Sequence, residues 1–175
     1  KASDAIFSGT ATNYIKSENF SNLLEDLSEE QNDPKDIIEK YSTNPSESEF
    51  KKISQFCDKI FKGDTVEEIV ENLKNENSDL SKKILSTIKQ KSPTSLKVAL
   101  KSLRLGKGIS FEECMMMEFR MVNKVMNDHD FYEGVRALII DKDNNPNWKP
   151  NKISEVEDSF VDEFFHKLDD DLKFN

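Results

Sequence analysis

The chain has 175 residues, which can form one domain or part of a larger one, and its 35% hydrophobic content is too high and too patterned for disorder throughout. A formal net charge of −9 argues against a general nucleic-acid-binding protein, because the phosphate backbone would repel the chain on average. No apolar run approaches the ~20 residues that span a membrane, and the two cysteines, Cys57 and Cys114, are too few for a disulfide framework.

The N-terminal part is predicted to be helical with one short extended segment. Residues 1–8 form a first helix that Gly9 ends, and no targeting leader precedes it, so we expect that the chain begins inside a longer protein. Residues 10–15 alternate β-branched and aromatic side chains, which is typical of a strand. Residues 19–27 have helical spacing, and Asp33 followed by Pro34 starts the next helix.

Later helices are marked at their starts by capping boxes, in which a Ser or Asp and a Glu three residues on accept hydrogen bonds from free backbone amides. Five pairs fit this pattern: Ser46/Glu49, Asp64/Glu67, Ser110/Glu113, Asp130/Glu133 and Ser154/Glu157. Ser92 and Pro93 open a further helix over residues 93–105 that Gly106 ends. The whole chain is therefore predicted to be mainly α, with about nine helices.

The predicted helix over residues 111–127 is apolar over an unusually broad arc. One stripe contains Phe111, Met115, Phe119, Val122 and Met126, and a second beside it contains Cys114, Met117, Met121 and Val125. Such an arc predicts burial on more than one side. Glu118 lies inside it, so this carboxylate is either a catalytic acid or, as we favour, a partner of an arginine such as Arg120 or Arg136. The methionines at 115–117 fit core packing better than a promiscuous binding groove.

One stretch of the chain is strongly basic and another strongly acidic. Residues 80–111 contain eight basic residues and no acid, and Lys97, Lys101 and Arg104 form one stripe along the predicted helix. Residues 155–171 hold eight acids against one lysine. These are either two solvated faces that attract each other, or the basic stripe binds the phosphates of an anionic ligand such as coenzyme A.

The remaining candidates carry little chemistry. His129 and His166 do not lie at metal-ligand spacing with either cysteine, so no metal site is predicted, and no Ser/His/Asp order indicates a triad. The segment "HDFYEGVRALIIDKDNNPNWKP", residues 129–150, predicts a short helix, a polar turn and a loop. Its Trp148 is interpreted as a loop anchor whose ring covers a helix, rather than as a ligand platform.

Several segments together identify a family. In chain order they are "KASDAIFSGTATNYI", "TVEEIVENL", "SPTSLKVALKSL", "MEFRMVNKVM", "HDFYEGVRALIIDKDNNPNWKP" and "LKF". The chain resembles the C-terminal half of the 3-hydroxyisobutyryl-CoA hydrolase branch of the crotonase (enoyl-CoA hydratase/isomerase) superfamily. The resemblance implies a mitochondrial thioester hydrolase of valine breakdown, with a catalytic ββα core followed by a helical C-terminal region. It divides the chain into a junction (1–27), a variable helical insert (28–63) and family-like helices (64–175).

The resemblance also sets expectations for the chemistry. The family's catalytic glutamate, aspartate and oxyanion turns match no residue of this chain, so no catalytic residue is assigned and the chain alone is expected to be inactive. Coenzyme A enters as part of the substrate, and no cofactor is expected. Expected partners are the missing N-terminal core and, through exposed apolar stripes, a second copy; no membrane or nucleic acid is expected. A non-catalytic scaffold related to a mitochondrial ribosome-associated paralogue, and an enoyl-CoA hydratase or isomerase, are the alternatives.

Overall fold

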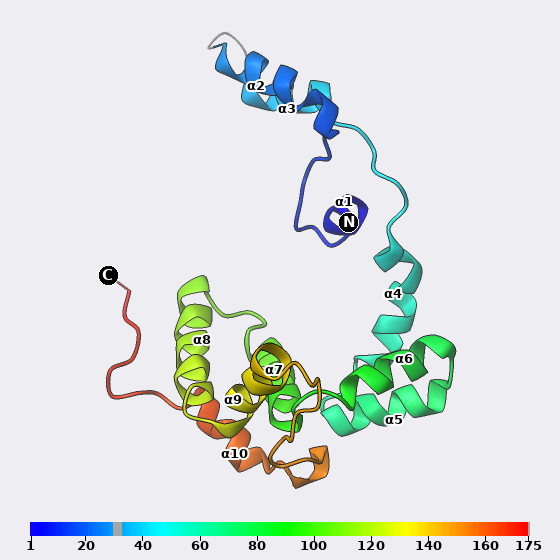
Figure 1. The fold of residues 1–175 in the computed structure, drawn as a ribbon. Helices are drawn as coiled ribbons and strands as arrows, with labels where there is room; N and C mark the ends of the chain where they lie inside the picture. Colours follow the sequence, from blue (N-terminus) through cyan, green and yellow to red (C-terminus); the bar gives the residue numbers. More distant parts are fainter. Residues whose placement is uncertain (30–32, 175) are drawn as a thin grey trace. The chain divides into compact units, whose positions relative to one another are not determined.

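The computed structural model describes residues 1–29 and 33–174, so residues 30–32 of the predicted insert lie outside the described residues. The chain divides into two compact units, residues 1–61 and residues 62–175 (Figure 1). The described residues form ten α-helices, with short 3-10 and π-helical segments between or after them. Their β-structure consists of one isolated bridge, so the predicted mainly α fold class is confirmed.

The first unit consists of four α-helices and the segment that connects α1 to α2. The helices are α1 (Ala2–Phe7), α2 (Phe20–Ser28), α3 (Pro34–Tyr41) and α4 (Glu49–Ile60), and the 3-10 segment η1 (Ser17–Asn19) leads into α2. Gly9 follows α1 with a φ of 73°, the left-handed conformation that ends a helix most easily at glycine.

The predicted extended segment over residues 10–15 is reduced to a single bridge. Ile15 pairs in antiparallel fashion with Ser42, and the amide of Thr43 donates to the carbonyl of Tyr14 at 2.9 Å. The pairing ends at this bridge, because the segment is too short to form a sheet by itself.

The second unit contains the remaining six α-helices. A helical hairpin opens it, followed by two long helices and a C-terminal run of short ones (Figure 1). The bounds are α5 (Val66–Glu76), α6 (Asp79–Ile88), α7 (Pro93–Leu105), α8 (Phe111–Val125), α9 (His129–Val135), η2 (Arg136–Ile140, a π-helix), η3 (Ile153–Glu155), α10 (Asp158–Asp162) and η4 (Glu163–Phe165).

The core of the second unit forms where the C-terminal segment packs against α7 and α8. Val98 of α7 is buried together with Val156, Val161 and Phe164 from the C-terminal segment. Met121 and Val125 of α8 also pack against this group. The acidic C-terminal segment therefore contributes apolar residues to the core as well as charge to the surface.

Helix starts are only partly those predicted. Asp33, Ser92 and the Ser110/Glu113 box cap α3, α7 and α8 as expected. The other four boxes were wrong: Ser48, Thr65 and Asp128 cap α4, α5 and α9, and α10 follows Glu157, which makes no side-chain cap.

Tertiary contacts explain two of these errors. The hydroxyl of Ser48 caps α4 and also donates to Asp4 Oδ1 at 2.8 Å, which links α4 to α1 inside the first unit. Asp130 accepts hydrogen bonds from Ser92 and from the backbone of Lys149. Its carboxylate is therefore engaged away from the start of α9, and Asp128 caps that helix instead.

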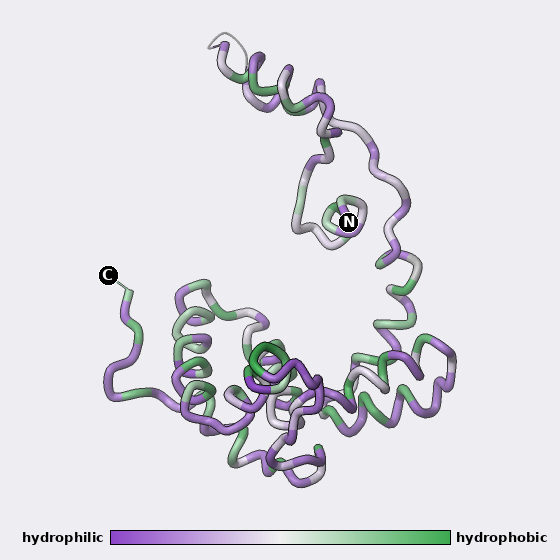
Figure 2. Tube along the Cα trace, viewed as in Figure 1, coloured by the Kyte–Doolittle hydropathy of each residue, from purple (hydrophilic) through white to green (hydrophobic). Residues whose placement is uncertain are grey.

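Helix α8 is buried on one side and open on the other. In the second predicted stripe, Met117 is buried and Met121 and Val125 pack against the core. The first stripe is exposed: Phe111, Met115, Phe119, Val122 and Met126 each keep 36% or more of their surface. Figure 2 shows apolar and polar residues mixed along α8. Glu118 is exposed, so its predicted burial against Arg120 or Arg136 was wrong within this chain.

Candidate functional site

The three residues of the predicted basic stripe line one cleft of the second unit. Lys97, Lys101 and Arg104 follow one face of α7 and meet the start of α5 and helix α10 in a cleft of about 580 Å³. Four acids line the same cleft, namely Asp64, Glu67, Asp158 and Asp162. The cleft is therefore not a purely positive surface.

Each of the three cations has a partner inside the unit. Lys97 Nζ lies 2.9 Å from Glu67 Oε1, donates to the carbonyl of Val156 at 2.9 Å and lies 3.6 Å from Asp158. Lys101 pairs with Asp162. Arg104 donates to the carbonyl of Gly63 at 2.7 Å. This arrangement favours the alternative of two oppositely charged faces, and binding of coenzyme A phosphates stays a prediction.

Helix α8 also forms ion pairs with the acidic segment, residues 155–171. Lys124 pairs with Glu163, and the guanidinium of Arg120 binds both carboxylate oxygens of Asp171. The hydrogen bond and charge of Arg120 lower the pKa of Asp171. Ion pairs from α7 and α8 thus hold residues 158–171 over the core.

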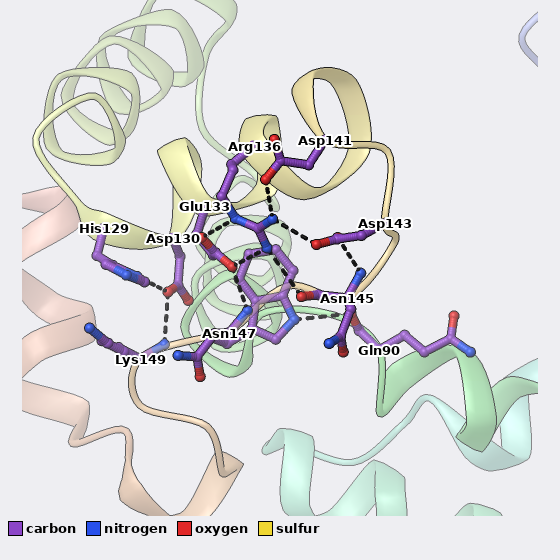
Figure 3. A network of polar contacts seen from close by, with 11 residues as sticks. Gln90, His129, Asp130, Glu133, Arg136, Asp141, Asp143, Asn145, Asn147 and Lys149 are labelled. Atoms are coloured by element: carbon purple, nitrogen blue, oxygen red, sulfur yellow. Dashed lines mark hydrogen bonds and ion pairs between the residues drawn. The ribbon is translucent and has the colours of Figure 1, made fainter.

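The segment over residues 129–150 forms a second polar site, built around one guanidinium (Figure 3). Arg136 donates to both oxygens of Glu133 at 2.8 and 2.9 Å, and its Nη1 lies 2.7 Å from Asp141 and 2.7 Å from Asp143. Arg136 Nη2 also donates to the carbonyl of Asn145 at 3.2 Å. Arg136 therefore links the end of α9 to the turn that follows η2.

Electrostatics make Glu133 a poor acid–base catalyst. Its hydrogen bonds from Arg136 and from the amide of Asn147 lower the pKa of Glu133 to about 2. A carboxylate with so low a pKa is a weak base and is almost never protonated near neutral pH. The ion pairs of Arg136 therefore give Glu133 a structural role.

Asp130 forms the other half of this site. It is buried and accepts a hydrogen bond from Ser92 Oγ at 2.5 Å. It also accepts from Lys149 N at 2.9 Å and from His129 Nδ1 at 3.1 Å (Figure 3). Asp130 lies in α9. It therefore links α9 to Ser92, which directly precedes α7, and to Lys149 in the loop after Trp148. The segments "SPTSLK" and "HDFYEGVRALIIDKD" meet at this carboxylate.

Trp148 anchors its loop and its ring covers a helix, as predicted. Its indole Nε1 donates to the carbonyl of Gln90 at 3.0 Å, and its ring covers Gly134 of α9. A Cβ at position 134 would lie 3.3 Å from the ring carbon Cη2, closer than most such contacts. Glycine at this position allows the ring to approach the helix backbone.

Between α7, α8 and α9 lies a second, mostly apolar cleft of about 510 Å³. Val98, Met121, Phe131 and Phe164 supply part of its wall. Within the described ranges, no three His, Cys, Asp or Glu side chains are grouped to hold a metal ion. In the same part of the chain, no helix is long and apolar enough to cross a bilayer.

Comparison with known proteins agrees with these motifs. The family model described as enoyl-CoA hydratase/isomerase matches residues 1–165. The chain belongs to this family. Among curated relatives, 3-hydroxyisobutyryl-CoA hydrolase, mitochondrial, from Xenopus laevis is 40% identical over 96% of the chain, and the human protein of that name is 38% identical over 99%.

The chain covers only part of these relatives. It spans 46% of the Xenopus laevis protein and 48% of the human one, about half the length of the curated relatives it matches. A solved carnitinyl-CoA dehydratase from Mycobacterium thermoresistibile is 26% identical with a TM-score of 0.87, and an enoyl-CoA hydratase from Rhodobacter sphaeroides 2.4.1 is 28% identical with a TM-score of 0.84. Each match covers 98% of this chain and 49% of the solved one.

The comparisons confirm the resemblance that the sequence segments predicted. They cover the helical region that contains both polar sites.

Proposed function

We propose that this chain is the C-terminal part of a mitochondrial 3-hydroxyisobutyryl-CoA hydrolase, which cleaves the thioester of its substrate to release coenzyme A. The observation that carries the proposal is the match of 36–40% identity to hydrolases of this name over 94–99% of the chain. The mitochondrial location rests on the same names.

The role proposed for the chain is to complete the fold and to shield the acyl-CoA site. Its charged groups support a structural role, because Glu133, Asp130 and Asp171 are all engaged by cations or hydrogen bonds. None of them is placed as a catalytic residue. The glutamate, aspartate and oxyanion turns that the resemblance implies would belong to the other half of the proposed parent protein.

Coenzyme A binding by the basic cleft is the alternative to the structural ion pairs of Lys97 and Lys101. Lys97, Lys101 and Arg104 share one cleft, which suits a ligand with several negative charges. Four acids line that cleft as well, so a bound phosphate would have to displace existing ion pairs.

Enzymes that hydrate an enoyl-CoA are the second candidate, because the two solved structures carry hydratase and dehydratase names at 26–28% identity. The test compares two reactions of the full-length parent: release of free thiol from 3-hydroxyisobutyryl-CoA, and loss of the enoyl absorbance of crotonyl-CoA. The proposal expects thiol release and little hydration. Hydration without thiol release would favour the hydratase. The absence of both reactions would favour a scaffold.

A further inference from the structure

The segment that follows η4 has no regular structure of its own. Residues 166–174, here called the strap, contain neither helix nor strand and run as an extended trace beside α8 (Figure 1). Among the described residues, no backbone-to-backbone hydrogen bond joins the strap to another segment. The family match ends at residue 165, so the strap lies beyond it. Side chains must therefore hold the strap in place.

A single carboxylate anchors the strap to α8. Arg120 Nε donates to the two carboxylate oxygens of Asp171 at 3.1 and 2.9 Å, and Arg120 Nη2 donates to Oδ2 at 2.5 Å. Asp171 is the only buried residue of the strap, and its side chain is 6% exposed. In the part of the chain that the structure describes, the strap makes no other hydrogen bond or ion pair with another element. This forked pair is a strong interaction, and the strap depends on it.

The segment that precedes the strap is anchored at several points instead. Val161 and Phe164 are buried in the core of the second unit. Lys124 of α8 pairs with Glu163, and its Nζ also lies 6.0 Å from the centroid of the Phe164 ring. Loss of any one of these contacts leaves the others in place. Residues 158–165 are therefore held independently of the strap.

We propose that the strap opens from α8 as one unit, with the pair of Arg120 and Asp171 as its single lock, while residues 158–165 stay in the core. Segments that open locally have few buried apolar contacts. The apolar side chains of the strap fit this description, since Leu168 and Leu172 are half-buried and Phe174 is 47% exposed.

Opening changes the charge that α8 presents. With the strap closed, the guanidinium of Arg120 is neutralised by Asp171 and is 23% exposed. With the strap open, the middle of α8 carries an unpaired cation with a free donor fork. The strap is thus a two-state device, and this switching does not depend on which reaction the parent catalyses.

The test measures distances between two spin labels in the full-length parent, whose own cysteines are replaced by serine. One label is attached at Lys173→Cys in the strap and the other at Glu112→Cys in the first turn of α8, and both positions are exposed. The distance distribution is expected to be narrow without further substitution. After Arg120→Gln it is expected to be at least about twice as wide, because a released segment samples many positions. Asp171→Asn, a change within the strap itself, is expected to widen the distribution equally.

Two controls separate release of the strap from general loosening. Lys124→Gln removes the other cation of α8 that pairs with the C-terminal segment, through Glu163, and is expected to leave the distribution narrow. A second label pair, Ser159→Cys with Glu112→Cys, reports on α10. Its distribution is expected to stay narrow in every variant, because the buried side chains of residues 158–165 keep α10 on the core.

An unchanged distribution for the Lys173 label in both Arg120→Gln and Asp171→Asn would overturn the proposal, because other contacts would then hold the strap. A wide distribution before any substitution of the pair would overturn it as well, since the strap would not be locked. Equal widening by Lys124→Gln, or widening of the Ser159 pair together with the Lys173 pair, would show that the whole C-terminal segment opens and that the strap is not a separate unit.

Discussion

The indole nitrogen of Trp148 donates a hydrogen bond to the carbonyl oxygen of Gln90 at 3.0 Å, across 58 positions of sequence. Gln90 follows α6, and the ring of Trp148 lies over Gly134 of α9. The loop after η2 is thereby fixed both to the turn before α7 and to α9. This contact and the Arg136 network stabilise the same segment from two sides.

Gly134→Ala is expected to destabilise the second unit by roughly 1 kcal/mol, although alanine favours a helix over glycine by a similar amount. The added Cβ would lie 3.3 Å from the ring of Trp148, which its hydrogen bond to Gln90 prevents from retreating freely. Urea unfolding of the single variants and of the double variant with Trp148→Ala measures this coupling. If Gly134→Ala is equally destabilising with and without the indole ring, the ring contact is not the reason for the glycine.

Stability is expected to fall in acid through Glu133. Arg136 and the amide of Asn147 lower the pKa of Glu133 to about 2 in the folded chain. A lowered pKa gives stability that is present above the unfolded value of about 4.5 and is lost as the pH falls toward 2. Melting temperatures across this range should decline less steeply for Glu133→Gln, which is also less stable near neutral pH. A parallel decline in both proteins would assign the acid sensitivity to other carboxylates, such as Asp171.

The capping box of α8 gives a local test. Ser110→Ala removes the acceptor for the amide of Glu113 and should destabilise the first turn of α8 by about 1 kcal/mol. Ser46→Ala is the control, because Ser48 and not Ser46 caps α4. Amide hydrogen exchange should accelerate in the first turn of α8 for the former and stay unchanged in α4 for the latter. Faster exchange in α4 after Ser46→Ala would show that this serine has a capping role.

The basic cleft can be tested in the full-length parent by replacing Lys97, Lys101 and Arg104 together with Gln. The ion pairs to Glu67, Asp158 and Asp162 predict a lower melting temperature and an unchanged KM for the acyl-CoA, with each partly exposed pair contributing roughly 1 kcal/mol or less. A raised KM that recovers toward the unsubstituted value at high salt, with kcat unchanged, would instead support coenzyme A phosphate binding.

Local sequence signals predicted the helices well and their starts less well. Asp33 with Pro34 and Ser92 with Pro93 place caps correctly, because each signal acts within one turn of the chain. The box at Asp130 was wrong for a non-local reason: its carboxylate accepts from Ser92, 38 positions away, and from Lys149, 19 positions away. Such contacts exist only in the folded chain and leave no periodic signal.

For the polar sites, too, local patterns were predicted from the sequence and non-local contacts were not. Charge patterning placed Lys97, Lys101 and Arg104 on one face and indicated the acidic segment opposite, but it could not decide which acid meets which cation. The broad apolar arc of α8 indicated contact on two sides, and the structure shows which side is covered within its own unit. Four carboxylate and carbonyl groups converge on Arg136, and that convergence depends on how η2 and the following turn fold.

The most direct test of the account measures coenzyme A release from 3-hydroxyisobutyryl-CoA by the full-length parent and by this 175-residue chain alone, each against a boiled control. The account predicts turnover by the parent and none above the control by the chain, because no catalytic group is assigned to it. Turnover by the chain alone, abolished by replacing one of its own residues, would contradict the account. A parent that folds but releases no coenzyme A would contradict it as well.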